Sequence, residues 1–448
     1  MLQEPDGQHG PDGRHARERA VLVGVDLDSD GCGRGDVDEL EALAKAAGAV
    51  VVGAVWQRRE CPDAAMYIGR GKVAALGRLA REQGANLVIS NNDLSAAQAR
   101  NLEEATGIRV VDRSQLIMDI FAAQANSRQA KFQVELAQLQ YTLPRLKRLW
   151  THLDRYKGGI GMRGPGERQI ESDRRIIQRR IGQLKRYLEA LDQRKQRELE
   201  GRQGFFSIGV VGYTNAGKST LLNRLTASRV ETADRPFSTL DTRTRVWHLG
   251  GGLRALLSDT VGFIRDLPHH LIASFRATLA EAATADLLLH VVDGSHDRAQ
   301  DHVQVVDGVL EAIGAGDVPR ILLINKIDRV ESLIDIRSLE RSARVTLAIS
   351  ARNGQGLSQL EAEVCRRIRG SFRRMLLCVS MEHAGILARL RAAGCDVGKP
   401  CKNGDLFEVE VRLPPWGAGL LAAAAERGEV AIRLLSPTGG DGESGGSE

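Results

Sequence analysis

The 448-residue sequence has no apolar run that approaches the roughly 20 residues needed by a membrane-spanning helix. Its longest apolar segments, such as Leu287–Val292, have the length of a buried strand. The first residues, MLQEPDGQHGPDGRHARER, are rich in Gly, Pro and charge and lack the apolar core of a secretory signal. We therefore expect a cytoplasmic protein without a membrane span.

Cysteine is also scarce. The chain has 6 cysteines, none forms a Cys-x-x-Cys pair, and no group of histidines lies beside them. Cys395 and Cys401 are the two closest in sequence, and two cysteines alone indicate a metal site only weakly. The sequence favours reduced, partly buried thiols over a metal site.

The two ends of the chain differ from its middle. Residues 1–18 and 436–448 are rich in Gly and charge and offer little apolar surface to bury, so both are predicted to be disordered tails. Between residues 19 and 126, short apolar strands such as Ala20–Val25 alternate with helical segments such as Asp36–Ala47. This alternation predicts a small α/β domain with a largely parallel sheet.

Two helical stretches follow, with leucine and other apolar residues spaced 4, 3, 4 and 3 apart, the spacing of paired helices. Pro144 is predicted to interrupt the first helix. Between the two stretches lies Gly158–Gly166, whose five glycines and one proline are incompatible with a regular helix. We expect an antiparallel helical hairpin with a glycine-rich tip, followed by a polar linker at 198–204.

The hairpin is strongly basic. From Leu143 to Arg186 there are thirteen Lys or Arg and four Asp or Glu, a local excess of about nine positive charges against +5 for the whole chain. A charge run of this kind is often only a solvated helix face. A local excess larger than the net charge of the protein also suggests a polyanionic partner.

A phosphate-binding motif follows the hairpin. Gly212–Ser219 reads GYTNAGKS and matches the P-loop pattern, after the apolar strand Ser207–Val211 and before the helix Lys218–Thr226. Loop amides and the positive end of the helix dipole would face the phosphates. Lys218 would reach the β- and γ-phosphates, and the Ser219 hydroxyl would bind Mg²⁺. A plain glycine turn before a helix would require neither Lys nor Ser there.

Asn325–Asp328, with the sequence NKID, indicates which base is bound. The Asp328 carboxylate can accept hydrogen bonds from N1–H and the 2-amino group of guanine, a pair that adenine lacks. ATP would leave that carboxylate unpaired, a mismatch that gives roughly 10⁴-fold discrimination. An ATP-driven enzyme is therefore disfavoured. Ser350 and Ala351 follow the strand Val345–Ile349 and would place a backbone N–H on the guanine oxygen.

Two further segments are predicted to respond to the γ-phosphate. Asp259 would hold Mg²⁺ through water, and the Gly262 N–H would contact the γ-phosphate. Thr239 is the predicted switch threonine that completes the Mg²⁺ shell, with Ser238 as the alternative. The predicted catalytic residues are Lys218, Thr239 and Gly262. The predicted metal ligands are Ser219, Thr239 and, through water, Asp259. The predicted nucleotide-binding residues are Gly212, Tyr213, Thr214, Asn215, Ala216, Gly217, Lys218, Ser219, Thr220, Phe237, Ser238, Thr239, Leu240, Asp241, Asp259, Thr260, Val261, Gly262, Asn325, Lys326, Asp328, Ser350, Ala351 and Arg352.

The predicted fold class is α/β: a P-loop GTPase domain, preceded by a small α/β domain with a helical hairpin and followed by a small α+β domain. The predicted parts are a tail at 1–18, an N-terminal α/β domain at 19–126, the hairpin and linker at 127–204, the GTPase domain at 205–372, a C-terminal α+β domain at 373–435 and a tail at 436–448.

The residue after Gly262 departs from the pattern of small GTPases, which place a water-orienting Gln shortly after this glycine. Here it is Phe263, whose ring cannot polarise water, so slow intrinsic hydrolysis is expected. Another group or a partner must then position the water. Within the chain, Arg243, Arg265 and the helical hairpin are candidates that the sequence does not rank.

The motifs together resemble the translation-associated GTPases of the TRAFAC class, and the upstream segments resemble the HflX family of the Obg-HflX superfamily. The segments that carry this resemblance are Val111–Phe121, Gln133–Leu139, Pro144–Leu146, Gly158–Glu167, Asp259–Arg265 and Tyr67–Lys72. Thr242, where many relatives have Pro, and the segment Ala125–Ala130 depart from the family pattern.

The resemblance implies a GTPase that uses Mg²⁺, binds the large ribosomal subunit and its rRNA as a monomer, and splits stalled or idle ribosomes. Arg163, Arg174 and Arg175 are the predicted contacts with RNA phosphates. The alternative is a nucleotide-gated assembly or hibernation factor whose hydrolysis is incidental. A hairpin that merely packs on the GTPase domain is a further alternative for its arms, and it does not explain the glycine-rich tip.

Overall fold

The computed structural model describes residues 18–27, 35–146, 165–200, 205–226, 243–260, 262–265, 281–330, 339, 343–392, 394–404, 406–414 and 418–434. Two compact units divide the chain. The first comprises residues 1–192, 233–241 and 264–278, and the second comprises residues 193–232, 242–263 and 279–448. In the described part of the chain, every helix is too short or too polar to cross a bilayer.

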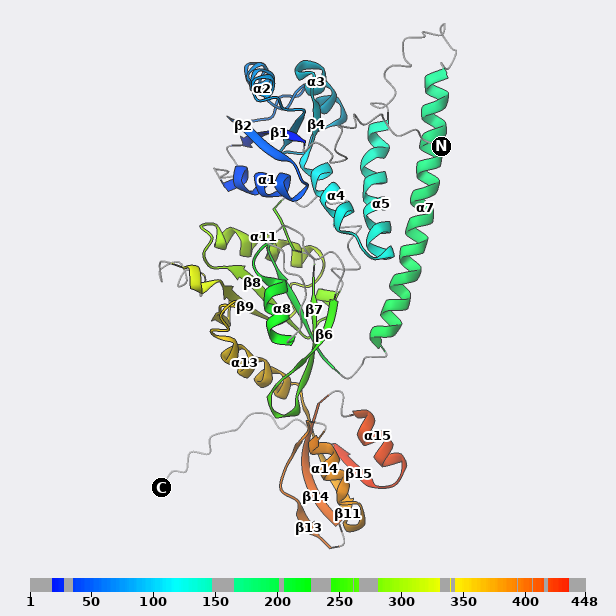
Figure 1. Ribbon diagram of the computed structural model, residues 1–448. Coiled ribbons are helices and arrows are strands. Elements are labelled where there is room, and N and C mark those ends of the chain that lie inside the picture. The colour runs from blue at the N-terminus through cyan, green and yellow to red at the C-terminus, as the bar shows by residue number, and fades with distance from the viewer. Residues whose placement is uncertain are drawn as a thin grey trace, which may run out of the picture. The chain divides into compact units, whose positions relative to one another are not determined.

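The first unit begins with a four-stranded parallel sheet in the order β2-β1-β3-β4. Its strands are β1 (Arg19–Leu27), β2 (Val50–Arg59), β3 (Leu87–Ser90) and β4 (Arg109–Val111). Its helices are α1 (Gly35–Ala46), α2 (Arg70–Glu82), α3 (Ala96–Thr106) and α4 (Arg113–Gln124). Helices α2 and α3 cover one face of the sheet, and α1 and α4 cover the other (Figure 1). Burial on both faces explains why the central strands β1 and β3 are almost continuously apolar rather than alternating.

The helical hairpin consists of α5 (Arg128–Thr142), the 3₁₀ turn η1 (Leu143–Arg145) and α7 (Pro165–Glu200). Helix α5 ends immediately before Leu143–Pro144, as predicted, because proline has no N–H and clashes with the preceding turn. The two helices pack through Leu136, Leu184 and Leu188, and the Phe132 and Tyr187 rings meet edge to face, 4.8 Å apart. Phe132 pairs with Tyr187 and Glu135 with Arg180, so the two helices run antiparallel.

Two details of the hairpin prediction were wrong. Helix α7 begins at Pro165, so the last residues of the glycine-rich segment are helical, since proline is favoured in a first helical turn. The helix also continues to Glu200 into the predicted linker, because Arg, Gln and Glu are good helix formers. The remainder of the tip, residues 158–164, lies outside the described part of the chain.

The second unit contains a six-stranded sheet in the order β10-β9-β8-β5-β7-β6. Its strands are β5 (Phe206–Gly212), β6 (Arg243–His248), β7 (Arg254–Asp259), β8 (Leu287–Asp293), β9 (Arg320–Asn325) and β10 (Thr346–Ala348). Its helical elements are α8 (Lys218–Thr226), η3 (Gly250–Gly252), α11 (Ala299–Ala312), η4 (Ile327–Arg329) and α13 (Leu357–Gly370). All strand pairs are parallel except β6 with β7. The chain changes direction across the sheet at β5, and ligands of such sheets bind at the carboxyl ends of the strands near this point.

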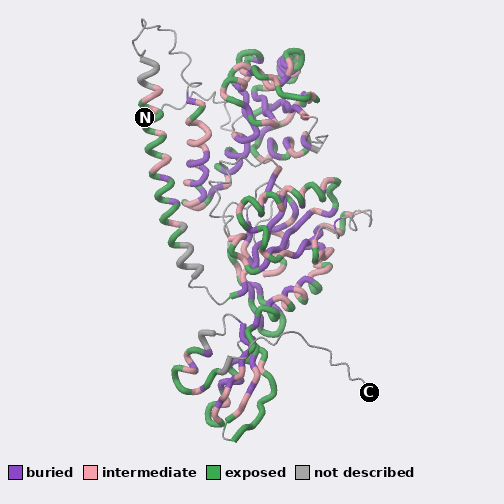
Figure 2. The backbone as a smooth tube through the Cα atoms, turned by 180° about the vertical axis from the view of Figure 1, so that it is seen from behind, coloured by how far each residue is buried: buried purple, intermediate pink, exposed green. Residues whose placement is uncertain are grey.

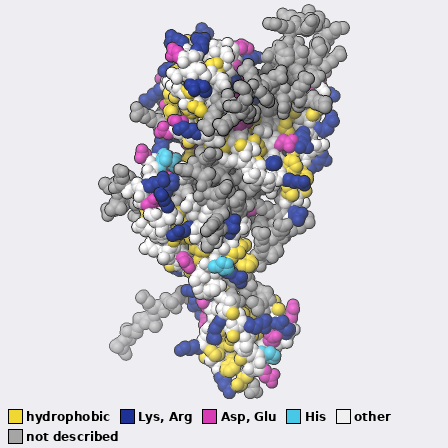
Figure 3. Space-filling model, viewed as in Figure 1, with side chains coloured by type: hydrophobic (Ala, Val, Ile, Leu, Met, Phe, Trp, Pro, Cys, Tyr) yellow, Lys and Arg dark blue, Asp and Glu magenta, His cyan; other side chains and the backbone are white. Residues whose placement is uncertain are grey.

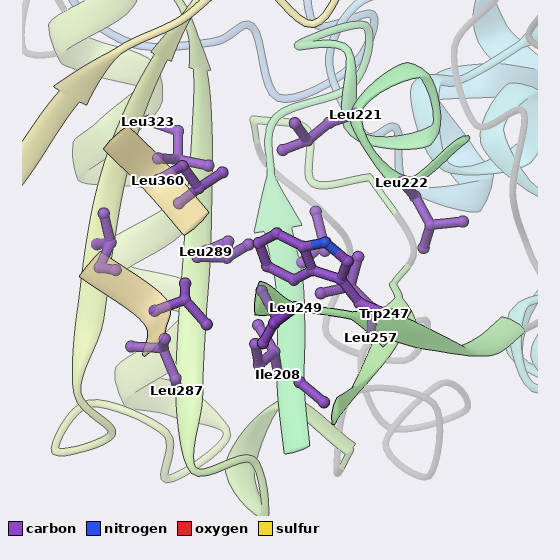
Figure 4. Packing of buried hydrophobic residues seen from close by; sticks show 14 of the residues in the cluster. Ile208, Leu221, Leu222, Trp247, Leu249, Leu257, Leu287, Leu289, Leu323 and Leu360 are labelled. Atoms are coloured by element: carbon purple, nitrogen blue, oxygen red, sulfur yellow. The ribbon is translucent and has the colours of Figure 1, made fainter. Parts of the chain in front are cut away.

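The core of this sheet is mainly aliphatic and includes the aromatic side chains of Phe206, Trp247 and Phe372. Figure 4 shows the indole of Trp247, from edge strand β6, lying among Ile208, Leu249 and Leu257. Trp247 is 3% exposed. Truncation of a core side chain of this size costs about 3–5 kcal/mol. Strand β6 was not predicted from the sequence, and its tryptophan closes one edge of the core.

The C-terminal region forms a separate antiparallel sheet within the second unit, in the order β12-β14-β11-β15 with β13 paired to β14. Its elements are β11 (Arg373–Ser380), η5 (Met381–His383), α14 (Gly385–Ala392), β12 (Asp396–Val397), β13 (Cys401–Asn403), β14 (Leu406–Leu413), α15 (Ala418–Glu426) and β15 (Val430–Leu434). The order is that of a split β-α-β fold. Its buried side chains include Leu377, Val379, Leu390 and Val409.

The predicted α/β fold class is confirmed, and the domain boundaries stay predictions. Figure 2 shows the contrast in burial: the central strands β1, β3, β5, β8 and β9 are mostly buried, whereas the described part of α7 is exposed along much of its length. A long helix with one narrow apolar stripe therefore leaves a wide polar surface.

Candidate functional site

The described residues that were predicted to bind the nucleotide follow four parallel strands at their carboxyl ends, and Asp293, which was not predicted, ends a fifth. The P-loop follows β5, Asp259 ends β7, Asp293 ends β8, Asn325 ends β9, and Ser350 follows β10. Parallel register places Asp293 directly beside Asn325. Motifs that are up to 140 residues apart in sequence thus reach one edge of one sheet.

The P-loop backbone needs glycine at two positions. Gly212 has φ +152°, and a Cβ there would lie 2.2 Å from the Val291 carbonyl oxygen. Gly217 has φ +95°, and its Cβ would lie 2.3 Å from the Asn325 amide nitrogen. Both distances are far below any ordinary contact, so these glycines allow the loop to pass close to two neighbouring strands.

Lys218 is the first residue of α8 and is 7% exposed. Its Nζ donates to the Gly212 carbonyl at 3.0 Å and to the Tyr213 carbonyl at 2.7 Å. Burial lowers the pKa of Lys218 to about 8, and the nearby Asp259 carboxylate opposes that shift. A phosphate group beside this ammonium would stabilise its charged form.

Ser219 and Asp259 form the oxygen pair expected of a magnesium site. The Ser219 hydroxyl donates to Asp259 Oδ2 at 3.1 Å, and Asp259 is 3% exposed. A hydroxyl and a carboxylate at the mouth of a phosphate loop are oxygen ligands of the kind that Mg²⁺ takes in nucleotide sites. The third predicted ligand, Thr239, lies outside the described residues, as do Phe237, Ser238, Leu240, Asp241 and Val261.

Asn325 joins the phosphate loop to the base-binding segments. Its amide nitrogen donates to the Ala216 carbonyl at 2.8 Å, and its Oδ1 accepts from the Ala351 N–H at 2.9 Å. The sequence predicted that a backbone N–H of Ser350 or Ala351 meets the guanine oxygen, and in this structure the Ser350 N–H donates to the Gln355 carbonyl and the Ala351 N–H to Asn325. Lys326 has φ +61° and pairs with Asp293 at 2.7 Å.

Asp328 lies in η4 and faces solvent. Its Oδ1 accepts from the Ser350 hydroxyl at 2.6 Å, a bond that lowers the pKa of Asp328. Asn353 donates its N–H to the same hydroxyl at 3.2 Å, which fixes the orientation of Ser350. The carboxylate is therefore ionised and oriented, with acceptor capacity left for a ligand.

Phe263 contributes its backbone to this site rather than its ring. Its N–H donates to the Gly212 carbonyl at 3.1 Å, and its carbonyl accepts from the Thr214 N–H at 2.7 Å. The ring is 1% exposed, so it is not a solvent-facing replacement for a glutamine. The sequence showed what this side chain lacks, but not that its backbone bridges to the P-loop.

Of the candidates for positioning water, Arg265 has another side-chain contact. Arg243 begins β6 opposite Asp259 in the antiparallel register. Arg265 Nη1 lies 3.6 Å from Asp36 Oδ1. The ion pair engages Arg265 in the first unit and weighs against it as the group that polarises water.

Sequence reasoning also missed Asp293 and a pair of stacked rings. Asp293 directly follows the apolar run of β8, a position at the strand end that could have signalled it. The Tyr213 and His302 rings stack at 3.8 Å with an interplanar angle of 7°. No sequence spacing links the P-loop to α11, so this stack required the structure.

The stack gives a prediction about pH. Burial, and then the neighbouring His296, lower the pKa of His302 to about 4. A histidine whose folded pKa lies below its ordinary value stabilises the fold above pH ~6.5, and this contribution is lost as the pH falls toward about 4. His290, with a pKa lowered to about 3 by burial, acts in the same direction. The thermal unfolding midpoint should therefore decrease as the pH is lowered from about 7.5 to about 5. His302→Gln should make this decrease smaller. Equal pH dependence in thermal unfolding of the variant and the parent protein would contradict this.

Three family models match the chain. They are described as GTP-binding GTPase N-terminal (residues 34–122), GTP-binding GTPase Middle Region (residues 124–202) and 50S ribosome-binding GTPase (residues 207–326). Together they cover the N-terminal sheet, the helical hairpin and most of the six-stranded sheet.

Curated relatives match over most of their length. The GTPase HflX of Alkalihalophilus pseudofirmus is 44% identical, over 84% of this chain and 88% of the relative. The GTPase HflX of Escherichia coli is 42% identical, over 89% of this chain and 94% of the relative. Among solved structures, a GTP-binding protein from Sulfolobus solfataricus in complex with GDP is 25% identical, covers 78% of this chain and 98% of its own, and has a TM-score of 0.42.

Proposed function

Since the chain belongs to the HflX family of GTPases and is therefore a GTP hydrolase, we propose that it binds the large ribosomal subunit and uses GTP to separate stalled or idle ribosomes into subunits. The observation that carries the proposal is the match of residues 207–326 to a model described as a 50S ribosome-binding GTPase. The exposed basic face of α7 supports ribosomal RNA as the part of the subunit to which the protein binds.

The proposed roles of the nucleotide-site residues follow the sequence motifs, and the geometry of the site supports them. Lys218 and the P-loop amides hold the phosphates, Asp328 holds the guanine edge, and the Gly262 N–H contacts the γ-phosphate. Ser219 and Thr239, with Asp259 through water, would hold Mg²⁺, which neutralises charge on the β- and γ-phosphates when bound.

Intrinsic hydrolysis is slow because the residue after Gly262 has no polar side chain that could orient the attacking water. Phe263 has an apolar, buried ring, and Arg265 is paired with Asp36. A ribosomal particle then supplies or orders the group that positions water. A single-turnover rate that no ribosomal particle changes would count against this part of the proposal.

The surface proposed for RNA is an arginine stripe on α7, defined here as Arg175, Arg179 and Arg186. Spacings of 4 and 7 residues place the three on one helix face, opposite the seam that contains Leu184. All three are exposed. Arg175 also pairs with Glu171 at 2.8 Å, so Arg179 and Arg186 are the stronger candidates for phosphate contacts.

The other two contacts predicted from sequence stay predictions. Arg174 is exposed on the flank of the helix, and Arg163 lies outside the described residues. Arg180 pairs with Glu135 of α5, with its Nε 2.7 Å from Oε1, so its charge is used within the hairpin. Figure 3 shows Lys and Arg side chains along the described part of α7.

Neutralising the stripe should weaken binding to the large subunit. In the variant Arg179→Gln/Arg186→Gln, loss of two phosphate contacts should lower the affinity about tenfold. The slope of log K against log salt concentration should become less negative by about 1.4. The measurement is sedimentation with isolated large subunits at several salt concentrations. Arg366→Gln, which removes an exposed arginine on α13, is the control and should bind normally. An unchanged salt slope in the double variant would remove the stripe from the proposed interface.

The alternative function is a nucleotide-gated assembly or hibernation factor whose hydrolysis is incidental. The buried ring of Phe263 favours it, because it removes the usual water-orienting side chain. A subunit-dissociation assay with GTP and with a non-hydrolysable analogue separates the two functions. Catalytic recycling predicts many splitting events per protein with GTP and at most one with the analogue. Many rounds with the analogue would favour the alternative.

A further inference from the structure

Asp293 ends β8 in the second unit, and each of its two carboxylate oxygens has a partner of its own. Oδ1 accepts from the Ser295 N–H at 3.0 Å and from the Ser295 hydroxyl at 2.7 Å. Oδ2 lies 2.7 Å from Nζ of Lys326. Ser295 thus fixes the orientation of the carboxylate, and the second oxygen holds the lysine.

The ends of β8 and β9 approach closely at this point. Asp293 is paired with Asn325 in the parallel register, and the Gly294 N–H donates to the Asn325 carbonyl at 2.9 Å. A Cβ on Gly294 would lie 2.5 Å from Ile324 Cγ2, so a side chain there would displace the isoleucine. The close approach brings the Asp293 carboxylate within reach of the residue that follows Asn325.

That residue, Lys326, has a left-handed backbone with φ +61°. Such a conformation is unfavourable for a residue with a Cβ, so surrounding contacts must hold it. Before the turn, the buried Asn325 side chain donates to the Ala216 carbonyl. After the turn, Asp328 faces solvent and accepts from Ser350. The turn at Lys326 therefore sets how the Asp328 carboxylate is presented.

The ion pair between Asp293 and Lys326 is largely shielded from solvent, since the two side chains are 16% and 17% exposed. Burial alone would raise the pKa of Asp293, but hydrogen bonds from Lys326 and Ser295 outweigh it and lower that pKa below its usual range. The carboxylate is therefore ionised at neutral pH. Removal of one member of such a pair leaves the other charge without a partner, which destabilises the local structure.

We propose that Asp293 is a positioning residue for the guanine base. Through Lys326 it stabilises the turn that presents the Asp328 carboxylate, and it thereby sets the affinity for guanine nucleotides whatever their number of phosphates. In this role Asp293 touches neither the nucleotide nor the attacking water. The inference rests on the role proposed above for Asp328.

The test measures the affinities of the 448-residue protein for GDP, for a non-hydrolysable GTP analogue and for inosine diphosphate, and its single-turnover rate at saturating GTP. Asp293→Asn should bind GDP and the analogue about tenfold more weakly, a loss within the range for residues in contact. Its preference for GDP over inosine diphosphate, which lacks the 2-amino group, should decrease because Asp328 is displaced. The rate should stay at the parent value, since Lys218 and Gly262 make the proposed contacts with the γ-phosphate.

Two further variants show whether Asp293 acts through Lys326. Lys326→Met combined with Asp293→Asn should bind GDP no more weakly than Lys326→Met alone, because both substitutions remove the same ion pair. Ser295→Ala keeps the Asp293 charge but loosens its orientation, so it should show the same pattern of losses at smaller size. Parent-like affinities in Asp293→Asn, or losses that add in the double variant, would overturn the inference.

The matched control is Asp286→Asn, at the opposite end of β8. Asp286 Oδ2 accepts from the Ser207 N–H and hydroxyl, each at 2.7 Å, so this variant removes the same charge and a similar serine contact. It should bind the three nucleotides as the parent protein does. An equal loss of GDP affinity in Asp286→Asn, or a slower saturated rate in Asp293→Asn, would indicate a general effect on the sheet and contradict the positioning role.

Thermal unfolding identifies any variant that has lost its fold, and Ser295→Ala then serves in place of Asp293→Asn. Asp328→Asn separates the inference from the proposed base pocket. If Asp328→Asn keeps the parent preference for GDP over inosine diphosphate, the role proposed for Asp328 fails. If it loses that preference while Asp293→Asn keeps the parent affinities, the positioning role alone fails.

Discussion

Asp328→Asn should weaken GTP binding by about 10²–10⁴-fold and create binding of xanthosine triphosphate. The ionised carboxylate accepts from two guanine donors, and each hydrogen bond to a charged group is worth about 1.5–3 kcal/mol. An asparagine amide would present a donor to the guanine 2-amino group. Xanthine has an oxygen there and can accept from that amide. The measurement is equilibrium titration with fluorescent guanine and xanthine nucleotides.

The geometry around Asp328 makes this variant specific. Ser350 donates to Asp328 at 2.6 Å and can equally donate to an amide oxygen, so the local fold should survive. Asp317→Asn, an exposed aspartate of the same unit, is the matched control and should bind GTP normally. Undiminished GTP affinity in Asp328→Asn would overturn the assignment of the base pocket.

Lys218→Ala should lower the single-turnover rate of GTP hydrolysis by about 10²–10³-fold. The ammonium lies buried at the start of α8, where it would neutralise charge that develops on the transferred phosphoryl group. Loss of the ammonium should also weaken the binding of GTP more than the binding of GDP, since the contact with the γ-phosphate disappears entirely. Rapid-quench hydrolysis measurements at saturating nucleotide give the rate independently of affinity.

Loss of the fold must be separated from loss of catalysis in this variant. Lys218 also donates to the carbonyls of Gly212 and Tyr213, so its removal affects the loop backbone. Lys218→Met fills more of the buried volume and, if the charge is what matters, should be as slow as Lys218→Ala. Hydrolysis at the parent rate in a folded Lys218→Met protein would remove Lys218 from the catalytic assignment.

The local motifs were predictable because their chemistry depends on short, contiguous sequence. Helix α8 spans Lys218–Thr226 as predicted, and α5 ends just before Pro144. Both depend on neighbours only a few residues away: a glycine loop before a helix, and a proline that cannot continue one. The parallel sheets were likewise visible as apolar runs between helical segments.

What the sequence did not reveal depends on contacts across the fold. Strand β6 is an edge strand whose one large apolar anchor, Trp247, enters a core built from distant strands. The Phe263 backbone bridge, the Tyr213–His302 stack and the Arg265–Asp36 pair join segments separated by 50 to more than 200 residues. Backbone pairing and ring stacking between distant segments produce no regular spacing in the sequence. A single arginine or aspartate could form an ion pair with many other residues, so its partner is not predictable from the sequence.

Control of ribosome binding by GTP is tested by sedimentation of the 448-residue protein, loaded with a non-hydrolysable GTP analogue or with GDP, with separated ribosomal subunits across a series of salt concentrations. With the analogue the protein should bind the large subunit, with GDP it should bind much more weakly, and the affinity should fall steeply as salt increases. Equal binding with both nucleotides, or binding to the small subunit alone, would contradict the claim that GTP controls docking on the large subunit.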